Sequence, residues 1–227
     1  LERLAKVAAK VRRQAVSRLN TLRSGLEEVR GEVAKLEVDA IHIPFFDPIS
    51  IGWLIVPFFM LVVFATANAV NITDGLDGLA GGLSAIAFAA YAIIAFIEGK
   101  YGLSGFCMTV AGALLAYTWF NIYPARFFMG DVGSFALGTA LGVVALLTDT
   151  VLLLPIIGFV FVIEAGSSLL QVLSKRLTSK RIFAIAPIHH HFEAIGWPET
   201  KVTMRFWVIG QVAAFVGIIL FILGGPK

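Results

Sequence analysis

Residues 68–78 read Asn68-Ala69-Val70-Asn71-Ile72-Thr73-Asp74-Gly75-Leu76-Asp77-Gly78, and they follow one long apolar run, 51–70, and precede another, 79–97. Two carboxylates, two amides and a threonine therefore lie at a membrane edge, where acidic side chains are expensive and tend to be functional. The two aspartates are three residues apart, so they share one face of a helical turn. The two glycines let a ligand approach the backbone closely. The stretch predicts a binding site; a merely polar turn between two spans is the alternative.

The composition predicts a membrane protein with several spans. Of the 227 residues, 58% are hydrophobic and 15% are charged, and the mean hydropathy is +0.87. These values are too apolar for an ordinary soluble domain, and a net charge of +3 gives no reason to expect nucleic-acid binding. The single cysteine, Cys107, cannot form an intrachain disulfide and is interpreted as a packing residue. The charged N-terminus lacks an early apolar core, so no cleavable signal peptide is expected.

Residues 1–38 differ from the rest of the chain and contain half of its lysines and arginines. Apolar residues recur there at spacings of three and four, which indicates an amphipathic or coiled-coil helix. This segment could lie on an anionic membrane surface, pair with another helix, or be a fusion segment. Because the composition changes abruptly near Asp39, residues 39–227 are predicted to form a separate transmembrane region.

Six apolar runs follow a connection at 39–50 and predict an all-α, polytopic transmembrane helix bundle. Glycine and alanine recur along these runs, as close helix packing in lipid favours. The expected spans are 51–70, 79–97, 104–122, 135–147, 151–173 and 206–223.

The charge of the connecting loops predicts the orientation of the bundle. Loops 71–78, 123–134 and 174–205 fall on one side, and they carry Arg126, Lys175, Arg176, Lys180, Arg181, Lys201 and Arg205. The opposite side holds only Lys100 near the spans, together with the terminal Lys227. Positive residues favour the cytoplasm, so the first side is predicted to be cytoplasmic. The unusual polar residues lie on that same side, which predicts one shared site.

A second polar stretch, at 119–134, reads Trp119-Phe120-Asn121-Ile122-Tyr123-Pro124-Ala125-Arg126-Phe127-Phe128-Met129-Gly130-Asp131-Val132-Gly133-Ser134. Asp131 lies between glycines at the start of a span. A carboxylate with amide and hydroxyl oxygens nearby suits Mg²⁺, which prefers oxygen ligands. Asp131 could also cap the following helix, and the two roles are compatible.

A third stretch reads Ala186-Pro187-Ile188-His189-His190-His191-Phe192-Glu193, with Gly196-Trp197-Pro198-Glu199 after it. Three adjacent histidines cannot all face one metal on a regular helix. One or two could bind phosphate or exchange a proton near neutral pH; a zinc site and a purely structural role are the alternatives. Glu164 and Gln171 share a helical face in the fifth span and could line the cleft or form interhelical hydrogen bonds.

The stretches 71–78, 128–134 and 187–193 together resemble the phospho-N-acetylmuramoyl-pentapeptide transferase (MraY) family, which belongs to the polyprenyl-phosphate N-acetylhexosamine-1-phosphate transferases. Order, spacing and topology agree over about 41–223, and the triple histidine favours the muramoyl-pentapeptide branch. The sequence departs from the family pattern because it has fewer spans and no pair of adjacent aspartates. The chain is therefore interpreted as the C-terminal part of such a protein, as a fusion of that part, or as a chain whose partner supplies the rest.

The resemblance implies a Mg²⁺-dependent reaction at the cytoplasmic face of the bacterial inner (plasma) membrane. Undecaprenyl phosphate would attack the β-phosphate of UDP-N-acetylmuramoyl-pentapeptide, giving lipid I and UMP for peptidoglycan synthesis. Asp131 would be the metal ligand, and the catalytic residues would be Asp74, His189 and His190. The residues expected to bind substrate are Asn71, Asp77, Asn121, Phe128, Gln171 and His191.

Other functions are compatible with the same residues. The chain could load a different UDP-sugar onto the same lipid, or bind nucleotide-sugar in the membrane without turnover. A transporter is also conceivable, although its charged residues would lie nearer the bilayer midplane than these do. The expected protein partners are a second copy of the chain, or a helix that pairs with residues 1–38.

Overall fold

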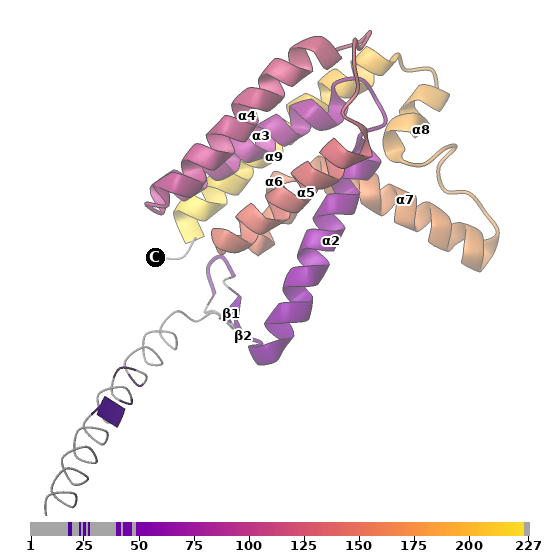
Figure 1. Cartoon of the computed structure of the whole chain (residues 1–227). Coiled ribbons are helices and arrows are strands. Elements are labelled where there is room, and N and C mark those ends of the chain that lie inside the picture. Colours follow the sequence, from indigo (N-terminus) through magenta and orange to yellow (C-terminus); the bar gives the residue numbers. More distant parts are fainter. Residues whose placement is uncertain are drawn as a thin grey trace, which may run out of the picture.

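The protein is a helical membrane bundle (Figure 1). A computed structural model describes residues 18, 19, 23, 25, 27, 40–41, 43–46 and 49–224. The interpretation of residues 1–38 as an amphipathic segment falls almost entirely outside these described residues, so it stays a prediction. The division of the chain at residue 39 stays a prediction for the same reason.

Helices account for nearly all of the described structure, which confirms the all-α prediction. The strands β1 (Ala40–Ile41) and β2 (Ile49–Ser50) form one short antiparallel pair in the connection before the first span. The helices are η1 (Gly52–Leu54), α2 (Ile55–Thr73), α3 (Leu79–Ile97), α4 (Tyr101–Asn121), α5 (Gly130–Leu147), η2 (Val151–Leu153), α6 (Leu154–Ile157), α7 (Phe159–Thr178), α8 (Ile188–Ala194) and α9 (Glu199–Gly224).

Several of these helices can cross a membrane, as the composition predicted. Five are long and apolar enough on their own, and they cover 52–73, 79–97, 101–121, 130–147 and 199–224. A sixth candidate is a broken pair, 151–157 with 159–178, whose halves are bent by 84°. The protein is therefore a multi-pass membrane protein with five or six spans in its described part.

The segment predicted as a span at 151–173 is broken at Gly158. The N–H of Gly158 donates to the carbonyl of Leu154 at 2.8 Å and ends α6, and α7 then leaves at 84°. Glycine is a poor helix former, so a break at this residue costs little. The break turns α7, which carries Glu164 and Gln171, toward the loops at one end of the bundle.

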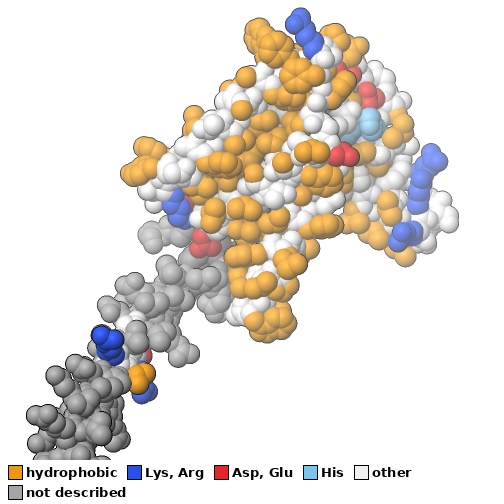
Figure 2. Space-filling model, in the orientation of Figure 1, with side chains coloured by type: hydrophobic (Ala, Val, Ile, Leu, Met, Phe, Trp, Pro, Cys, Tyr) orange, Lys and Arg blue, Asp and Glu red, His pale blue; other side chains and the backbone are white. Residues whose placement is uncertain are grey.

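Helix α3 is the centre of the bundle and packs between α4 and α9 (Figure 1). Its side chains Phe88 and Tyr91 are wholly buried, and Ser104 of α4 donates to the carbonyl of Ala92 at 2.8 Å. Figure 2 shows apolar side chains over much of the outer surface, as a lipid-facing surface requires, and a group of acidic and histidine side chains near the end where α8 lies. The loop that precedes α3 is therefore anchored on the most buried helix of the protein.

Helices α2 and α5 approach so closely that their backbones are in contact. Gly138 and Gly142 have the Gly-x-x-x-Gly spacing that favours close helix packing in lipid. A Cβ atom at residue 138 would lie 2.6 Å from both Ala67 Cα and the carbonyl oxygen of Thr66. This packing brings the C-terminal end of α2 beside the N-terminal turn of α5.

Candidate functional site

The three polar stretches meet at one end of the bundle, as their placement on one side predicted. The N–H of Gly78 donates to Asn121 Oδ1 at 2.9 Å, which joins the α2–α3 loop to the end of α4. The N–H of Ala125 donates to Asp77 Oδ2 at 2.9 Å, and the N–H of Asp77 donates to Glu199 Oε1 at 2.7 Å. The α2–α3 loop is thus bonded to the α4–α5 loop and to the first turn of α9.

Asn71 connects α2 directly to the first turn of α5. Its Nδ2 donates to Asp131 Oδ1 at 3.0 Å and to Ser134 Oγ at 2.9 Å. The capping alternative for Asp131 is not supported, because no side chain caps α5 and Asp131 lies inside its first turn. A carboxylate in that position is stabilised by the helix dipole, and it stays exposed to a ligand.

Asp74 and Asp131 form a pair of interacting carboxylates. Burial raises the pKa of the Asp74 carboxyl, and the negative charge of Asp131 raises it further. Neither carboxylate takes part in an ion pair within the described part of the chain. Two nearby carboxylates without a basic partner favour a bound cation.

The oxygen atoms at this point fit a Mg²⁺ ion. No group of three His, Cys, Asp or Glu side chains in the described ranges is placed to hold a metal. Mg²⁺ does not need such a cage, since it usually binds one or two carboxylates and completes its shell with water and phosphate oxygens. Asp74 and Asp131 could supply the carboxylates, and Asn71 keeps its amide oxygen available because its Nδ2 makes the bonds to α5.

The rest of the α2–α3 loop is held by the last helix. Thr203 Oγ1 donates to the carbonyl of Asp77 at 3.3 Å, and Trp207 Nε1 donates to the carbonyl of Gly78 at 3.1 Å. Both backbone groups of Asp77 and one of its carboxylate oxygens are therefore used inside the protein. The prediction that Asp77 binds substrate stays a prediction, with only Oδ1 left for it.

The side-chain amides of Asn121 and Gln171 are buried and bonded at both ends. Asn121 accepts from Gly78 and donates to the carbonyl of Phe127 at 2.9 Å. Gln171 Oε1 accepts from the N–H groups of 182 and 183, and its Nε2 donates to the carbonyl of Phe183 at 2.9 Å. Their expected role in substrate binding stays a prediction; in this structure each amide closes a loop next to the site.

Asn121→Ala is expected to destabilise the protein, because it leaves the Gly78 N–H and the Phe127 carbonyl without their partner. A buried group left unsatisfied costs about 1–3 kcal/mol. The free energy of unfolding in detergent measures the loss. Asn68→Ala is the control, since the half-buried Asn68 amide donates to the carbonyl of Phe64 one turn earlier and joins no two loops. Equal stability of the two variants would contradict the role of Asn121 in holding the two loops together.

The three adjacent histidines have three different environments. His189 is wholly buried, and its Nδ1 lies 2.8 Å from Glu164 Oε2. His190 is 38% exposed at its side chain, and its Nδ1 lies 2.6 Å from Glu193 Oε2. His191 Nδ1 accepts from the N–H of Ala184 at 3.2 Å. Only His190 therefore combines a carboxylate partner with an accessible ring, and the catalytic roles predicted for His189 and His190 stay predictions.

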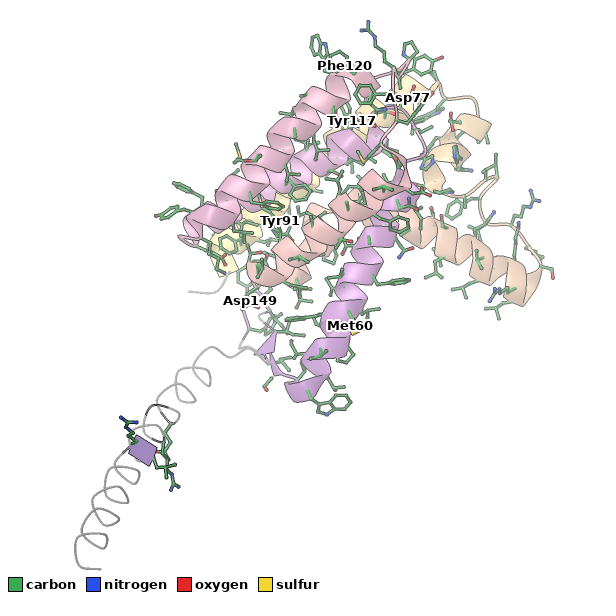
Figure 3. All side chains as sticks on the ribbon, viewed as in Figure 1. Met60, Asp77, Tyr91, Tyr117, Phe120 and Asp149 are labelled. Atoms are coloured by element: carbon green, nitrogen blue, oxygen red, sulfur yellow. The ribbon has the colours of Figure 1, made fainter. Side chains whose placement is uncertain are left out.

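Aromatic side chains border the same end of the bundle. Phe128 is 75% exposed in the α4–α5 loop, and Figure 3 shows Tyr117, Phe120 and Asp77 together in that region. A cavity of about 370 Å³ in this loop region is lined by Trp119, Phe120, Ile122, Pro124 and Arg126. Flat apolar rings with an adjacent arginine suit a planar, negatively charged ligand.

Four residues of the site had been assigned no role from the sequence. Ser134 and Glu199 bond to the predicted residues Asn71 and Asp77, and Glu193 bonds to His190. Thr203 holds the carbonyl of Asp77. The first three lie within or beside the polar stretches and could have been found there, whereas Thr203 lies on a long apolar helix without a distinguishing signal.

Comparison with known proteins agrees with the family resemblance that was based on the three polar stretches. The model of the family described as glycosyl transferase family 4 matches residues 21–149. A phospho-N-acetylmuramoyl-pentapeptide-transferase from Methylacidiphilum infernorum is 50% identical over 185 residues, covering 75% of this chain and 50% of that protein. One from Chloroflexus aurantiacus is 48% identical over 194 residues, covering 82% of this chain and 53% of that protein. The chain thus spans about half the length of these curated relatives.

Proposed function

Because this chain belongs to glycosyl transferase family 4, we propose that it transfers phospho-N-acetylmuramoyl-pentapeptide from its UDP conjugate to undecaprenyl phosphate. The products are lipid I and UMP, and the reaction belongs to peptidoglycan synthesis. The similar curated proteins carry the name phospho-N-acetylmuramoyl-pentapeptide-transferase. The activity is a proposal for this chain because it spans about half their length.

The carboxylate pair of Asp74 and Asp131 is the observation that carries this proposal. Both substrates bring phosphate charges into a site bordered by lipid, where an unscreened charge is expensive. A Mg²⁺ ion held by Asp131 and Asp74 would offset the charge of the diphosphate and stabilise the charge that develops on transfer. Asn71 holds Asp131 at 3.0 Å, which supports a fixed position for that ligand.

The reaction is proposed as a direct displacement. An oxygen of undecaprenyl phosphate forms a new bond to the β-phosphorus of the UDP conjugate, while the bond from that phosphorus to the oxygen shared with the α-phosphate breaks. UMP leaves with that oxygen and with the electron pair. No side chain needs to carry the phosphosugar in this scheme, so the work of the protein is positioning and electrostatic stabilisation.

The remaining polar groups are assigned to the substrate by their accessibility. His190, which is oriented by Glu193 through Nδ1, would donate from Nε2 to a phosphate oxygen when its imidazole carries both protons. The exposed ring of Phe128 would stack on the uracil, since a base has a π-face on which an aromatic side chain can stack. Asp77 Oδ1 and His191 remain for the ribose or the sugar. Asn121 and Gln171 would act by holding the loops that carry these groups.

The site is proposed to face the cytoplasm, where the UDP conjugate is made available. The loops at this end of the bundle contain seven basic residues, from Arg126 to Arg205, which supports that orientation. Lys175, Arg176, Lys180 and Arg181 would contact anionic headgroups or attract the phosphorylated substrates.

Lipid I formation by the full chain in detergent tests the proposal. The assay contains UDP-N-acetylmuramoyl-pentapeptide and undecaprenyl phosphate, with Mg²⁺ or with EDTA. Metal-dependent formation of lipid I and of an equal amount of UMP is the expected result. Product formation that is unchanged by EDTA would contradict the metal assignment, and no product in either condition would contradict the transferase proposal.

A second function is favoured by one observation, which is that the chain spans about half the length of its relatives. In that case the chain binds the nucleotide-sugar and does not turn it over alone. Calorimetric titration of the same preparation with UMP separates the two proposals, because binding without product supports the second one. Replacing the UDP conjugate by UDP-N-acetylglucosamine in the lipid assay tests for a sister transferase.

A further inference from the structure

The buried pair of His189 and Glu164 is not explained by the proposed reaction. Glu164 lies on α7 and His189 on α8, and neither side chain has more than 1% of its surface exposed. Their close contact joins Nδ1 of the imidazole to Oε2 of the carboxylate at 2.8 Å. The other two polar atoms, His189 Nε2 and Glu164 Oε1, are buried without a hydrogen-bond partner in the described part of the chain.

The imidazole of His189 lies directly against Gly75. A Cβ atom at residue 75 would overlap Nε2 of the ring and would lie 2.9 Å from its Cε1. Gly75 itself is exposed, and it directly follows Asp74 in the loop that carries both predicted aspartates. The ring therefore fills the space beneath the loop, and only a residue without a side chain fits above it.

A second contact fixes the position of the histidine relative to α7. Ser167, one turn after Glu164 on α7, accepts from the N–H of Ile188 at 2.9 Å. Its hydroxyl in turn donates to the carbonyl of Glu164 at 2.8 Å. Two consecutive residues of α8 are thus bonded to one turn of α7, so the ring position is set by α7 rather than by α8 alone.

We propose that Glu164 and His189 form a strut that positions the α2–α3 loop, with Glu164 fixing the imidazole and the imidazole fixing Gly75. His189 is then a positioning residue that does not touch substrate, and Glu164 acts through it on the placement of Asp74. This inference rests on the proposed function for its effect on turnover. It gives His189, which was predicted to be catalytic, the role of holding the loop in place.

Accessibility separates His189 from its neighbour. A catalytic histidine must come within hydrogen-bond reach of the substrate, and the buried Nε2 of His189 faces the protein's own backbone at Gly75. The His190 ring is 38% exposed and has its own carboxylate partner, Glu193. Of these two adjacent residues of α8, His189 therefore supports the loop and His190 is left to contact the substrate.

A double-mutant cycle between residues 75 and 189 tests the strut. Gly75→Ala forces the added methyl group against the ring, and His189→Ala removes the support, so each is expected to lower kcat by roughly 100-fold through displacement of the loop. The combined variant has room for the methyl group in the space that the ring leaves. It is therefore expected to exceed both single variants in kcat by about tenfold, which is a strong coupling.

The result that overturns the proposal is a combined variant with no more activity than His189→Ala. That outcome is expected of a catalytic histidine, whose chemistry a methyl group cannot replace. For the same four proteins, UMP affinity is measured by calorimetry and the unfolding midpoint is measured as well, because neither measurement needs turnover. If the unsubstituted chain forms no lipid I, the proposed transferase function has failed, and these two readouts still decide for or against the strut.

Variants of Glu164 test the second half of the proposal. Glu164→Gln keeps an oxygen that accepts from Nδ1 and is expected to retain kcat within about threefold, whereas Glu164→Ala releases the ring and is expected to lose roughly 100-fold. Ser104→Ala is the matched control, because it removes a buried hydrogen bond from α4 outside the site and should lower stability alone. A similar loss of kcat in Glu164→Gln and Glu164→Ala would contradict the positioning role.

Discussion

Asp131→Asn is expected to lower lipid I formation by about 1,000-fold or more. The substitution keeps the size of the side chain and its oxygen toward Asn71, but it removes the charge that faces Asp74. Loss of a metal ligand removes several kcal/mol of transition-state stabilisation, and about 1.4 kcal/mol corresponds to a tenfold change in rate. The initial rate of UMP release at saturating Mg²⁺ measures the effect.

Asp149→Asn is the control for this substitution. Asp149 lies two residues beyond the C-terminal end of α5, whereas Asp131 lies in its first turn. The two aspartates therefore sit at opposite ends of one helix, and Figure 3 shows Asp149 well separated from Asp77. Asp149→Asn is expected to leave the rate within about twofold, because the side chain lies at the opposite end of α5 from the site. An Asp131→Asn variant with the same rate as this control would exclude Asp131 from the metal site.

Gly138→Val is expected to lower both stability and activity, the latter by roughly 100-fold. A side chain at this position meets the backbone of α2, at Ala67 Cα and at the carbonyl of Thr66. Backbone cannot rotate away as a side chain can, so α2 and α5 must separate. Overpacking of this kind costs about 1–3 kcal/mol, and a displacement near 1 Å is enough for a hundredfold loss of rate. Asn71 would then no longer reach Asp131.

The matched control for Gly138→Val is Gly105→Val on α4, where a Cβ atom would meet nothing within 4 Å. The unfolding midpoint and the rate of UMP release are measured for both variants. A Gly138→Val protein that unfolds at a lower temperature and keeps the full rate would separate helix packing from the site. That result would show that the contact between Asn71 and Asp131 does not depend on the distance between α2 and α5.

Much of the fold follows from hydropathy and loop charge. The apolar runs predict which segments are helical, because burial in lipid leaves the chain few choices other than helix. Their bounds are less exact, since α5 and α9 begin five and seven residues before the predicted spans. The break at Gly158 was not predicted, because the run from 151 to 173 is apolar on both sides of it. Hydropathy reports how apolar a segment is and says nothing about its direction. Here the two halves point in different directions because α6 packs against α9 and α7 packs mainly against α2.

The sequence predicted that the polar stretches meet at one end of the bundle, whereas the roles of their residues stay predictions. Polar residues on one side of a membrane protein indicate a shared site, and the bond between Asn71 and Asp131 agrees with that. The amides of Asn121 and Gln171 were expected to bind substrate, which stays a prediction, and in this structure they bond to nearby backbone. An amide can accept from a ligand or from a loop with equal ease, so residue type alone does not distinguish these uses.

The contacts of the α2–α3 loop with α9 have a consequence for biosynthesis. Glu199, Thr203 and Trp207 hold Asp77 and Gly78, and the ribosome adds these three residues well after the loop. At typical synthesis rates the interval between Asp77 and Trp207 is on the order of ten seconds. A nascent chain that contains α2 and α3 therefore still lacks the residues of α9 that hold the loop between them. The α2–α3 loop can therefore form these contacts only after the ribosome has added Glu199, Thr203 and Trp207, so a chain that stalls earlier leaves Asp77 and Gly78 without these partners.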